Sequence, residues 1–218
     1  MKNNVTEQTL YRTYLAGFFA ILTLPILVSP LWFSPPDWGK TIIFRSILAI
    51  LLCLFAWQLL YRRNEVAIPH VKKNTIVWVL GLFGISVLLA TLFSQDMYFS
   101  LWGSPYRSQG AIDVFFYLAL PILAFLVIKP ADWSKLIQYS IFIGILVSLI
   151  AVIQFYGLLG NIFLSSLDRP PSTMGNPIML GLYMLLLFFI TLSFAIKEKI
   201  LTRRLAYIGI TVLFLSVI

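Results

Sequence analysis

Residues 177–196 read PIMLGLYMLLLFFITLSFAI, a stretch without a charged side chain that is long enough to cross a membrane as a helix. A hydrocarbon core of about 30 Å requires about 20 apolar residues in helical conformation. Further runs of the same kind occur at about 14–33, 41–60, 75–93, 111–128, 135–156 and 204–218. The sequence therefore predicts an all-α fold, a polytopic transmembrane helical bundle with about seven spans.

The composition supports this prediction and excludes several classes of protein. Of the 218 residues, 60% are hydrophobic and only 11% are charged, whereas soluble domains have about 25% charged residues. The net charge of +8 does not indicate a nucleic-acid partner, because the basic residues form short clusters between apolar runs and no basic face. Cys53 lies in an apolar run and is expected to be a small buried hydrophobe. No Cys/His cluster, P-loop or paired-carboxylate motif is present, so neither a metal site nor a cofactor is predicted.

The distribution of Lys and Arg predicts the orientation of the chain in the membrane. If the N-terminus is cytoplasmic, twelve basic residues fall on the inner side: Lys2, Arg12, Arg62, Arg63, Lys72, Lys73, Lys129, Lys135, Lys197, Lys199, Arg203 and Arg204. Only four fall on the outer side or in the adjoining helix ends: Lys40, Arg45, Arg107 and Arg169. Because basic residues concentrate on the cytoplasmic side of membrane proteins, we expect a cytoplasmic N-terminus.

The last apolar run is still apolar at Ile218, with no polar stop after it. We therefore expect residues 1–218 to form a single membrane domain that is the N-terminal portion of a longer protein.

The outer loop LDRPPSTMGNPIMLG (167–181) predicts an anion site. Gly175 permits a tight turn, Asn176 is a good N-cap, and Pro177 suits the first helical position, so a helix should begin at Asn176 or Pro177. Arg169 lies shortly before this outward-facing helix N-terminus. An arginine beside a helix N-terminus favours phosphate binding.

The outer loop FSQDMYFSLWGSPYRSQGAID (93–113) repeats this pattern. Arg107 precedes Gln109 and Gly110, which lead into the next inward-running helix, and Asp113 falls in its first turn. Asp113 is a possible partner of Arg107. If the two loops converge, they would bind a diphosphate at the outer membrane surface. The alternative is an aromatic belt in which the arginines extend to lipid head groups.

Three further polar residues lie near the same membrane face. Arg45 lies about five residues into the second apolar run, where a charge either faces the bundle or a watery cavity or extends to the surface. Gln154 and Asn161 either line the same cavity or form structural hydrogen bonds. His70, in contrast, falls in a predicted inner loop and is not a candidate base for chemistry on the outer face.

The motifs SLWGSPYRSQG (100–110) and RPPSTMGNPIMLGLYMLLL (169–187) resemble, in order and spacing, two signatures of the O-antigen ligase and polymerase superfamily. The resemblance covers about residues 91–189. It implies a multi-pass protein of the bacterial inner membrane and an inverting, metal-independent glycosyltransferase. Such an enzyme takes a glycan from an undecaprenyl-diphosphate carrier on the outer face. Arg107 and Arg169 would contact the diphosphate, while Gln109, Gly110, Gly175 and Asn176 shape the two corners.

Family members continue beyond the part that this chain resembles, with a large outer loop that supplies a histidine and further arginines. We therefore expect the chain alone to be inactive and to require a C-terminal half or a partner subunit. Two alternatives to an enzyme stay open. One is a transporter or flippase of lipid-linked glycans, which should carry polar residues at mid-membrane depth. The other is a non-catalytic membrane scaffold, in which Arg107 and Arg169 are replaceable.

Overall fold

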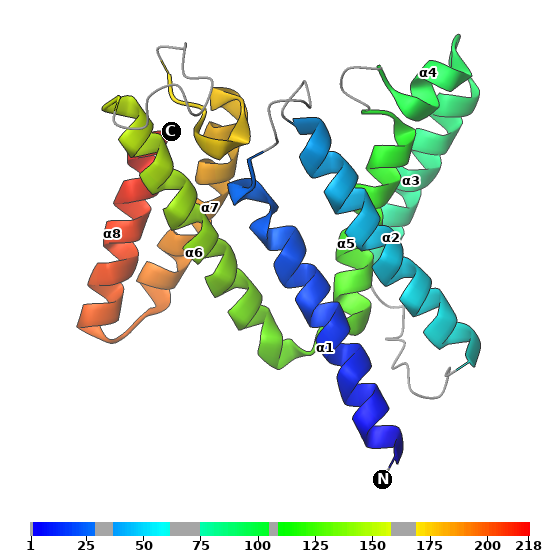
Figure 1. Cartoon of the computed structure of the whole chain (residues 1–218), viewed down its shortest axis with the longest axis horizontal. Helices are drawn as coiled ribbons and strands as arrows, with labels where there is room; N and C mark the ends of the chain where they lie inside the picture. Colours follow the sequence, from blue (N-terminus) through cyan, green and yellow to red (C-terminus); the bar gives the residue numbers. More distant parts are fainter. Residues whose placement is uncertain (1, 29–36, 62–74, 105–108, 158–168) are drawn as a thin grey trace. The chain divides into compact units, whose positions relative to one another are not determined.

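The computed structural model describes residues 2–28, 37–61, 75–104, 109–157 and 169–218. These described residues are mainly helical and contain no β-strand (Figure 1). The all-α fold class is confirmed. The α-helices are α1 (Lys2–Thr23), α2 (Asp37–Tyr61), α3 (Thr75–Leu92), α4 (Met97–Trp102), α5 (Ala111–Val127), α6 (Pro130–Phe155), α7 (Pro177–Lys197) and α8 (Leu201–Val217). Two 3-10 helices accompany them, η1 (Leu24–Ile26) and η5 (Ser172–Met174). Arg107, Asn161 and His70 lie outside the described residues.

Four segments are long and apolar enough to cross a membrane: Glu7–Ile26, Gly39–Tyr61, Pro130–Phe155 and Pro177–Lys197. Two shorter apolar helices, Trp78–Leu92 and Ala111–Val127, coincide with two other predicted spans. Helix α8 occupies the seventh predicted run, but it includes Arg203 and Arg204 near its start. The structure thus supports a membrane protein with four candidate spans, and the number seven stays a prediction.

The helix boundaries differ from the predicted runs at both ends of α1. The helix begins at Lys2, well before the apolar run, and it ends at Thr23 rather than near residue 33. Pro25 lies at the start of η1. Proline has no N–H to donate and its ring collides with the preceding turn, so the α-helix stops before it. The hydropathy of the run alone does not predict that the α-helix ends here.

Helix α4 is an element that the apolar runs did not predict. The side chain of Asp96 caps its N-terminus by accepting a hydrogen bond from the N–H of Phe99 at 2.9 Å. Gly103 ends the helix with a φ of 78°, a conformation that glycine adopts without steric cost. A helix of six residues is too short to be recognised from hydrophobic periodicity, and its local signals are the N-cap aspartate and the glycine that ends it.

The helices form two compact units, each with its own packing. The first comprises residues 1–18 and 33–130, and the second comprises residues 19–32 and 131–218. In the first unit, α5 packs against α2, α3 and α4. Tyr14 of α1 donates a hydrogen bond to Gln58 of α2 at 3.1 Å, and a Cβ at Gly17 would meet the side chain of Leu51 at 2.8 Å. Glycine therefore permits the close approach of α1 and α2.

The second unit has a hydrophobic core formed by α6, α7 and α8. Its buried members are Ile141, Ile143, Val147, Ala151, Leu180, Met184, Leu187 and Phe214. A Cβ at Gly144 of α6 would collide with Leu187 of α7 and crowd Phe214 of α8. Small residues let helix backbones approach closely where lipid gives no hydrophobic driving force for association. The three helices thus pack around one glycine.

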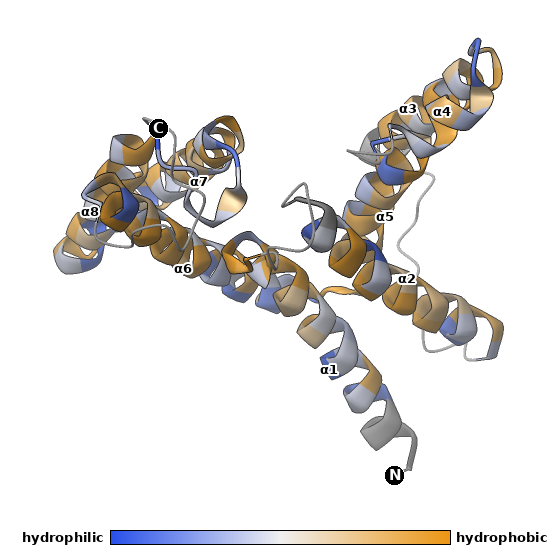
Figure 2. Cartoon of the chain, turned by 45° about the horizontal axis from the view of Figure 1, so that its top comes forward, coloured by the Kyte–Doolittle hydropathy of each residue, from blue (hydrophilic) through white to orange (hydrophobic). Residues whose placement is uncertain are grey.

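Many large apolar side chains are exposed on these helices. Figure 2 shows that hydrophobic residues predominate along the helices of both units, and Leu60, Phe93 and Ile178 are among the most exposed. Soluble monomers rarely expose contiguous apolar surface of this extent, whereas a lipid-facing surface requires it. Cys53 belongs to this surface: its side chain is exposed on α2, so the expectation of a buried cysteine was wrong.

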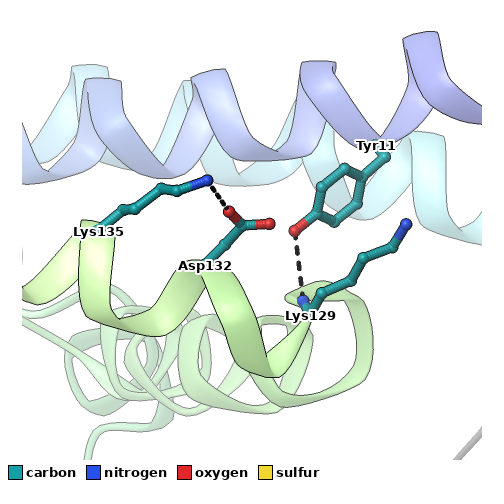
Figure 3. Close-up of polar contacts among 4 residues, drawn as sticks. All are labelled: Tyr11, Lys129, Asp132 and Lys135. Carbon is teal, nitrogen blue, oxygen red and sulfur yellow. Dashed lines mark hydrogen bonds and ion pairs between the residues drawn. The ribbon is translucent and has the colours of Figure 1, made fainter.

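The lysines near the start of α6 have partners of their own (Figure 3). In the first unit, the backbone N–H of Lys129 donates a hydrogen bond to the Tyr11 hydroxyl at 3.4 Å, and its Nζ lies 4.5 Å from the centroid of the Tyr11 ring. In the second unit, Lys135 forms an ion pair with Asp132 at 2.6 Å. These basic residues have structural contacts, so neither is a leading candidate for binding an anionic ligand.

Candidate functional site

The second unit contains a cavity of about 780 Å³, which we call the α6–α7–α8 cavity. It lies where the C-terminal ends of α6 and α8 meet the N-terminal turns of α7. Its lining is mainly apolar: Ala151, Val152, Phe155, Pro170, Pro177, Ile178, Leu180, Gly181, Leu182, Leu185, Val217 and Ile218, with Tyr156, Arg169 and Ser216 as the polar members. Volumes of about 300–1,000 Å³ are typical of small-molecule sites.

Arg169 is the one charged residue of this lining. Its side chain is exposed, and it forms no ion pair or hydrogen bond within the described residues. A guanidinium presents several N–H donors in a rigid plane that matches the oxygens of a phosphate. The cavity therefore combines an apolar interior with an available cation, which suits a ligand that has an apolar body and an anionic head.

The start of α7 agrees with the sequence-based prediction. Asn176 is the N-cap and Pro177 is the first helical residue. The Asn176 Oδ1 accepts a hydrogen bond from the N–H of Ile178 at 2.8 Å. Because Pro177 has no N–H and Ile178 donates to the cap, the helix end offers fewer free donors than the sequence suggested. Its contribution to anion binding is mainly the positive end of the helix dipole.

A tight turn connects Arg169 to α7. Gly175 has a φ of 74°, as the predicted turn requires, and Ser172 also has a positive φ, 51°. Ser172 is the one such non-glycine residue in the described ranges. Left-handed backbone is costly for a residue with a Cβ, so it persists only where the surroundings support it.

Gln154, near the end of α6, supplies part of that support. Its Oε1 accepts a hydrogen bond from the Ser172 N–H at 2.8 Å, and its Nε2 donates a longer one, 3.5 Å, to the Ser172 carbonyl oxygen. Both residues are buried. Of the two alternatives that the sequence left open for Gln154, the structure favours the structural hydrogen bonds. The one local signal for this role is an amide side chain in an otherwise apolar helix.

In the first unit, the predicted residues Gln109 and Gly110 line a smaller hollow of about 300 Å³, together with residues of α3, α4 and α5. Gly110 is the N-cap of α5, and Asp113 falls in the first turn, as predicted. A Cβ at Gly110 would collide with the Leu101 carbonyl group and the Gly103 nitrogen, so this corner requires glycine. Gln109 is exposed.

Arg45 pairs with Asp113 rather than lying free. The Nη2 of Arg45 lies 2.6 Å from Oδ1 of Asp113, and its Nε donates a hydrogen bond to the same oxygen at 2.7 Å. The guanidinium therefore faces the helices of its unit, one of the placements that the sequence left open. The carboxylate already compensates much of its charge, which makes Arg45 a weaker anion ligand than Arg169.

The structure thus groups the predicted site residues into two sets. Arg169, Gly175 and Asn176 belong to one turn of the second unit. Arg45, Gln109 and Gly110 belong to the first unit, around the start of α5. The convergence of the two loops stays a prediction, as does the role of Arg107.

Comparisons with known proteins identify no relative: no protein-family model, no curated protein and no solved structure matches this chain. The resemblance to the O-antigen ligase and polymerase superfamily therefore rests on the two short sequence motifs alone.

Proposed function

We propose that this chain binds a polyprenyl-diphosphate-linked glycan at the outer face of the bacterial inner membrane, and that it serves glycan transfer of the O-antigen ligase or polymerase type. The observation that carries the proposal is the place of Arg169 in the lining of the apolar α6–α7–α8 cavity, where it has no ion pair or hydrogen bond to the described residues. An undecaprenyl diphosphate has the same two-part character, a long apolar tail and a doubly charged head.

The arrangement of Arg169 beside an apolar cavity suits the chemistry of glycan transfer. When a sugar leaves a polyprenyl-diphosphate carrier, negative charge develops on the departing diphosphate. A guanidinium and the positive end of a helix, placed where that charge appears, stabilise it without reorganising solvent. Arg169 and the N-terminus of α7 supply these two elements, while the apolar lining accepts part of the tail. That a glycan acceptor and a base that activates it complete the reaction is supported by the family resemblance alone.

We further propose the seven-span topology with a cytoplasmic N-terminus. Within the second unit, the basic residues Lys197, Lys199, Arg203 and Arg204 gather at the α7–α8 connection, at the opposite end of α7 from the cavity. The 21 residues of α7 rise by about 1.5 Å each and span about 31 Å, the thickness of a hydrocarbon core. Basic residues at one end and the cavity at the other agree with an inner hairpin and an outer site.

The described helices give little support to a transporter. The buried hydroxyls of Thr191 and Thr211 bond to each other at 3.0 Å and to backbone carbonyls of their own helices. Ser148 donates to the sulfur of Met184 at 3.0 Å. These polar groups are satisfied within the packing of α6, α7 and α8, so they do not form a polar path of the kind that transport requires.

A binding experiment with the purified chain in nanodiscs tests the proposal. It compares the affinity of the chain for undecaprenyl diphosphate with its affinity for undecaprenol. We expect the diphosphate to bind more tightly, and we expect Arg169→Gln to remove most of this preference while leaving the affinity for undecaprenol unchanged. Arg169→Lys should retain only part of the preference, because lysine lacks the planar, bidentate geometry of the guanidinium. Equal affinity of the wild type for the two lipids, or an unaltered preference in Arg169→Gln, would favour the scaffold alternative.

A further inference from the structure

We propose that Gln154 is a positioning residue for the anionic head of the ligand, because it holds the turn that carries Arg169 into α7. This inference rests on the proposed function, and it assigns to a residue of α6 a role in the selectivity of the site for a charged lipid.

The first step of the argument is the conformation of Ser172. Its φ of 51° places a residue with a Cβ in the left-handed region, which an unsupported chain seldom adopts. Both backbone polar groups of Ser172 face the side-chain amide of Gln154, with its N–H 2.8 Å from Oε1 and its carbonyl oxygen 3.5 Å from Nε2. An amide is the side chain that can accept from the one and donate to the other. Gln154 thus replaces the backbone partners that an irregular, buried turn lacks.

The second step is the place of this turn in the site. Ser172 lies three residues after Arg169 and four residues before the N-cap Asn176. A change in its backbone angles therefore redirects both the guanidinium and the start of α7. Two side-chain bonds also fix the turn: Ser172 Oγ donates to the Val147 carbonyl oxygen at 2.7 Å, and Thr173 Oγ1 donates to the Pro25 carbonyl oxygen at 2.6 Å. Gln154 is the member of this set that holds the backbone itself.

The third step separates Gln154 from the apolar part of the site. Gln154 is absent from the lining of the α6–α7–α8 cavity, although its helical neighbours Ala151, Val152 and Phe155 belong to it. Replacing Gln154 by an apolar residue of similar volume should thus preserve the volume that accepts the lipid tail. It should alter only the placement of the charged head.

The experiment compares Gln154→Leu with the wild type in the full chain, using undecaprenyl diphosphate and undecaprenol as probes. We expect the preference for the diphosphate to fall by about tenfold or more, the equivalent of one to two lost hydrogen bonds to a buried group, with the affinity for undecaprenol unchanged. Gln58→Leu is the matched control, because Gln58 also accepts a hydrogen bond within an apolar helix but belongs to the first unit. It should leave the preference as it is.

A second variant tests the conformational cause. Ser172→Ala removes the Oγ bond to Val147 but keeps both backbone contacts with Gln154, so it should retain more of the preference for the diphosphate than Gln154→Leu does. A preference unaltered in Gln154→Leu would overturn the inference. So would a parallel loss of affinity for undecaprenol, which would mean that Gln154 merely maintains the fold. Failure of the proposed function is separate: in that case the wild type shows no preference or Arg169→Gln leaves it unaltered.

Discussion

The guanidinium of Arg45 on α2 forms an ion pair with the carboxylate of Asp113 on α5, with Nη2 2.6 Å from Oδ1. Asp113 is 2% exposed and Arg45 is 23% exposed, so the pair is largely removed from solvent. The other carboxylate oxygen, Oδ2, is buried without a hydrogen-bond partner in the described part of the chain. The pair therefore joins two helices of the first unit at the end where α5 begins.

The first prediction concerns the stability that this pair provides. Asp113→Leu should lower the free energy of unfolding by about 3 kcal/mol, because it removes the carboxylate that compensates the partly buried charge of Arg45. The double variant Arg45→Met/Asp113→Leu should be close to the wild type, since replacing a buried pair by apolar residues is often neutral. Thermal unfolding in detergent micelles measures both effects. A double variant as unstable as the single one would show that the charges are not coupled.

The second prediction separates the capping role of Asn176 from its place beside the anion. Asn176→Asp should keep the stability of α7, because aspartate caps helices as well as asparagine does. It should lower the affinity for undecaprenyl diphosphate by at least about tenfold, through repulsion between the new carboxylate and the head group. Asn176→Ser, which caps without a charge, is the control. Titration of each variant with the diphosphate and with undecaprenol measures the effect. A diphosphate affinity that is equal in the Asp and Ser variants would place the anion elsewhere.

The third prediction concerns the tail. Gly181 lines the α6–α7–α8 cavity, and a Cβ there would meet no atom within 4 Å. Gly181→Trp should fill the cavity and lower the affinity for both undecaprenyl diphosphate and undecaprenol by about tenfold, the cost of returning roughly two buried methylene groups to a less favourable environment. Because the site is open, the variant should fold normally.

Gly209 of α8 provides the matched control for this variant. A Cβ at Gly209 also meets no atom within 4 Å, and Gly209 does not line the cavity. Gly209→Trp should leave both affinities unchanged. Equal behaviour of the two tryptophan variants would mean that the lipid tail does not occupy the cavity.

Local signals in the sequence were sufficient to predict the start of one helix in each unit. Asn176 and Pro177 define the beginning of α7, and Gly110 the beginning of α5, because caps and first-turn residues act within a few positions of the chain. The all-α fold class was predictable from the long apolar runs.

The tertiary contacts of the polar residues in both units were not predictable because they join distant parts of the chain. The sequence offered Arg107, a near neighbour, as a possible partner of Asp113, whereas the structure pairs Asp113 with Arg45, 68 positions away. The pairing of Gln154 with Ser172 likewise depends on how the turn before α7 folds back on α6. Composition and periodicity indicate which residues favour a helix or a bilayer. They do not indicate which buried polar groups form hydrogen bonds or ion pairs with each other.

The most direct test of the central claim is to locate the bound lipid on the full chain. A polyprenyl diphosphate with a photoreactive diazirine in its tail, irradiated with the protein in nanodiscs, labels the residues that it touches, and mass spectrometry identifies them. We predict labelling at the ends of α6 and α8 and in the first turns of α7, lost on addition of excess undecaprenyl diphosphate and weakened in Arg169→Gln. Labelling confined to α2, α3 and α5, or labelling insensitive to the competitor and to Arg169, would contradict the account.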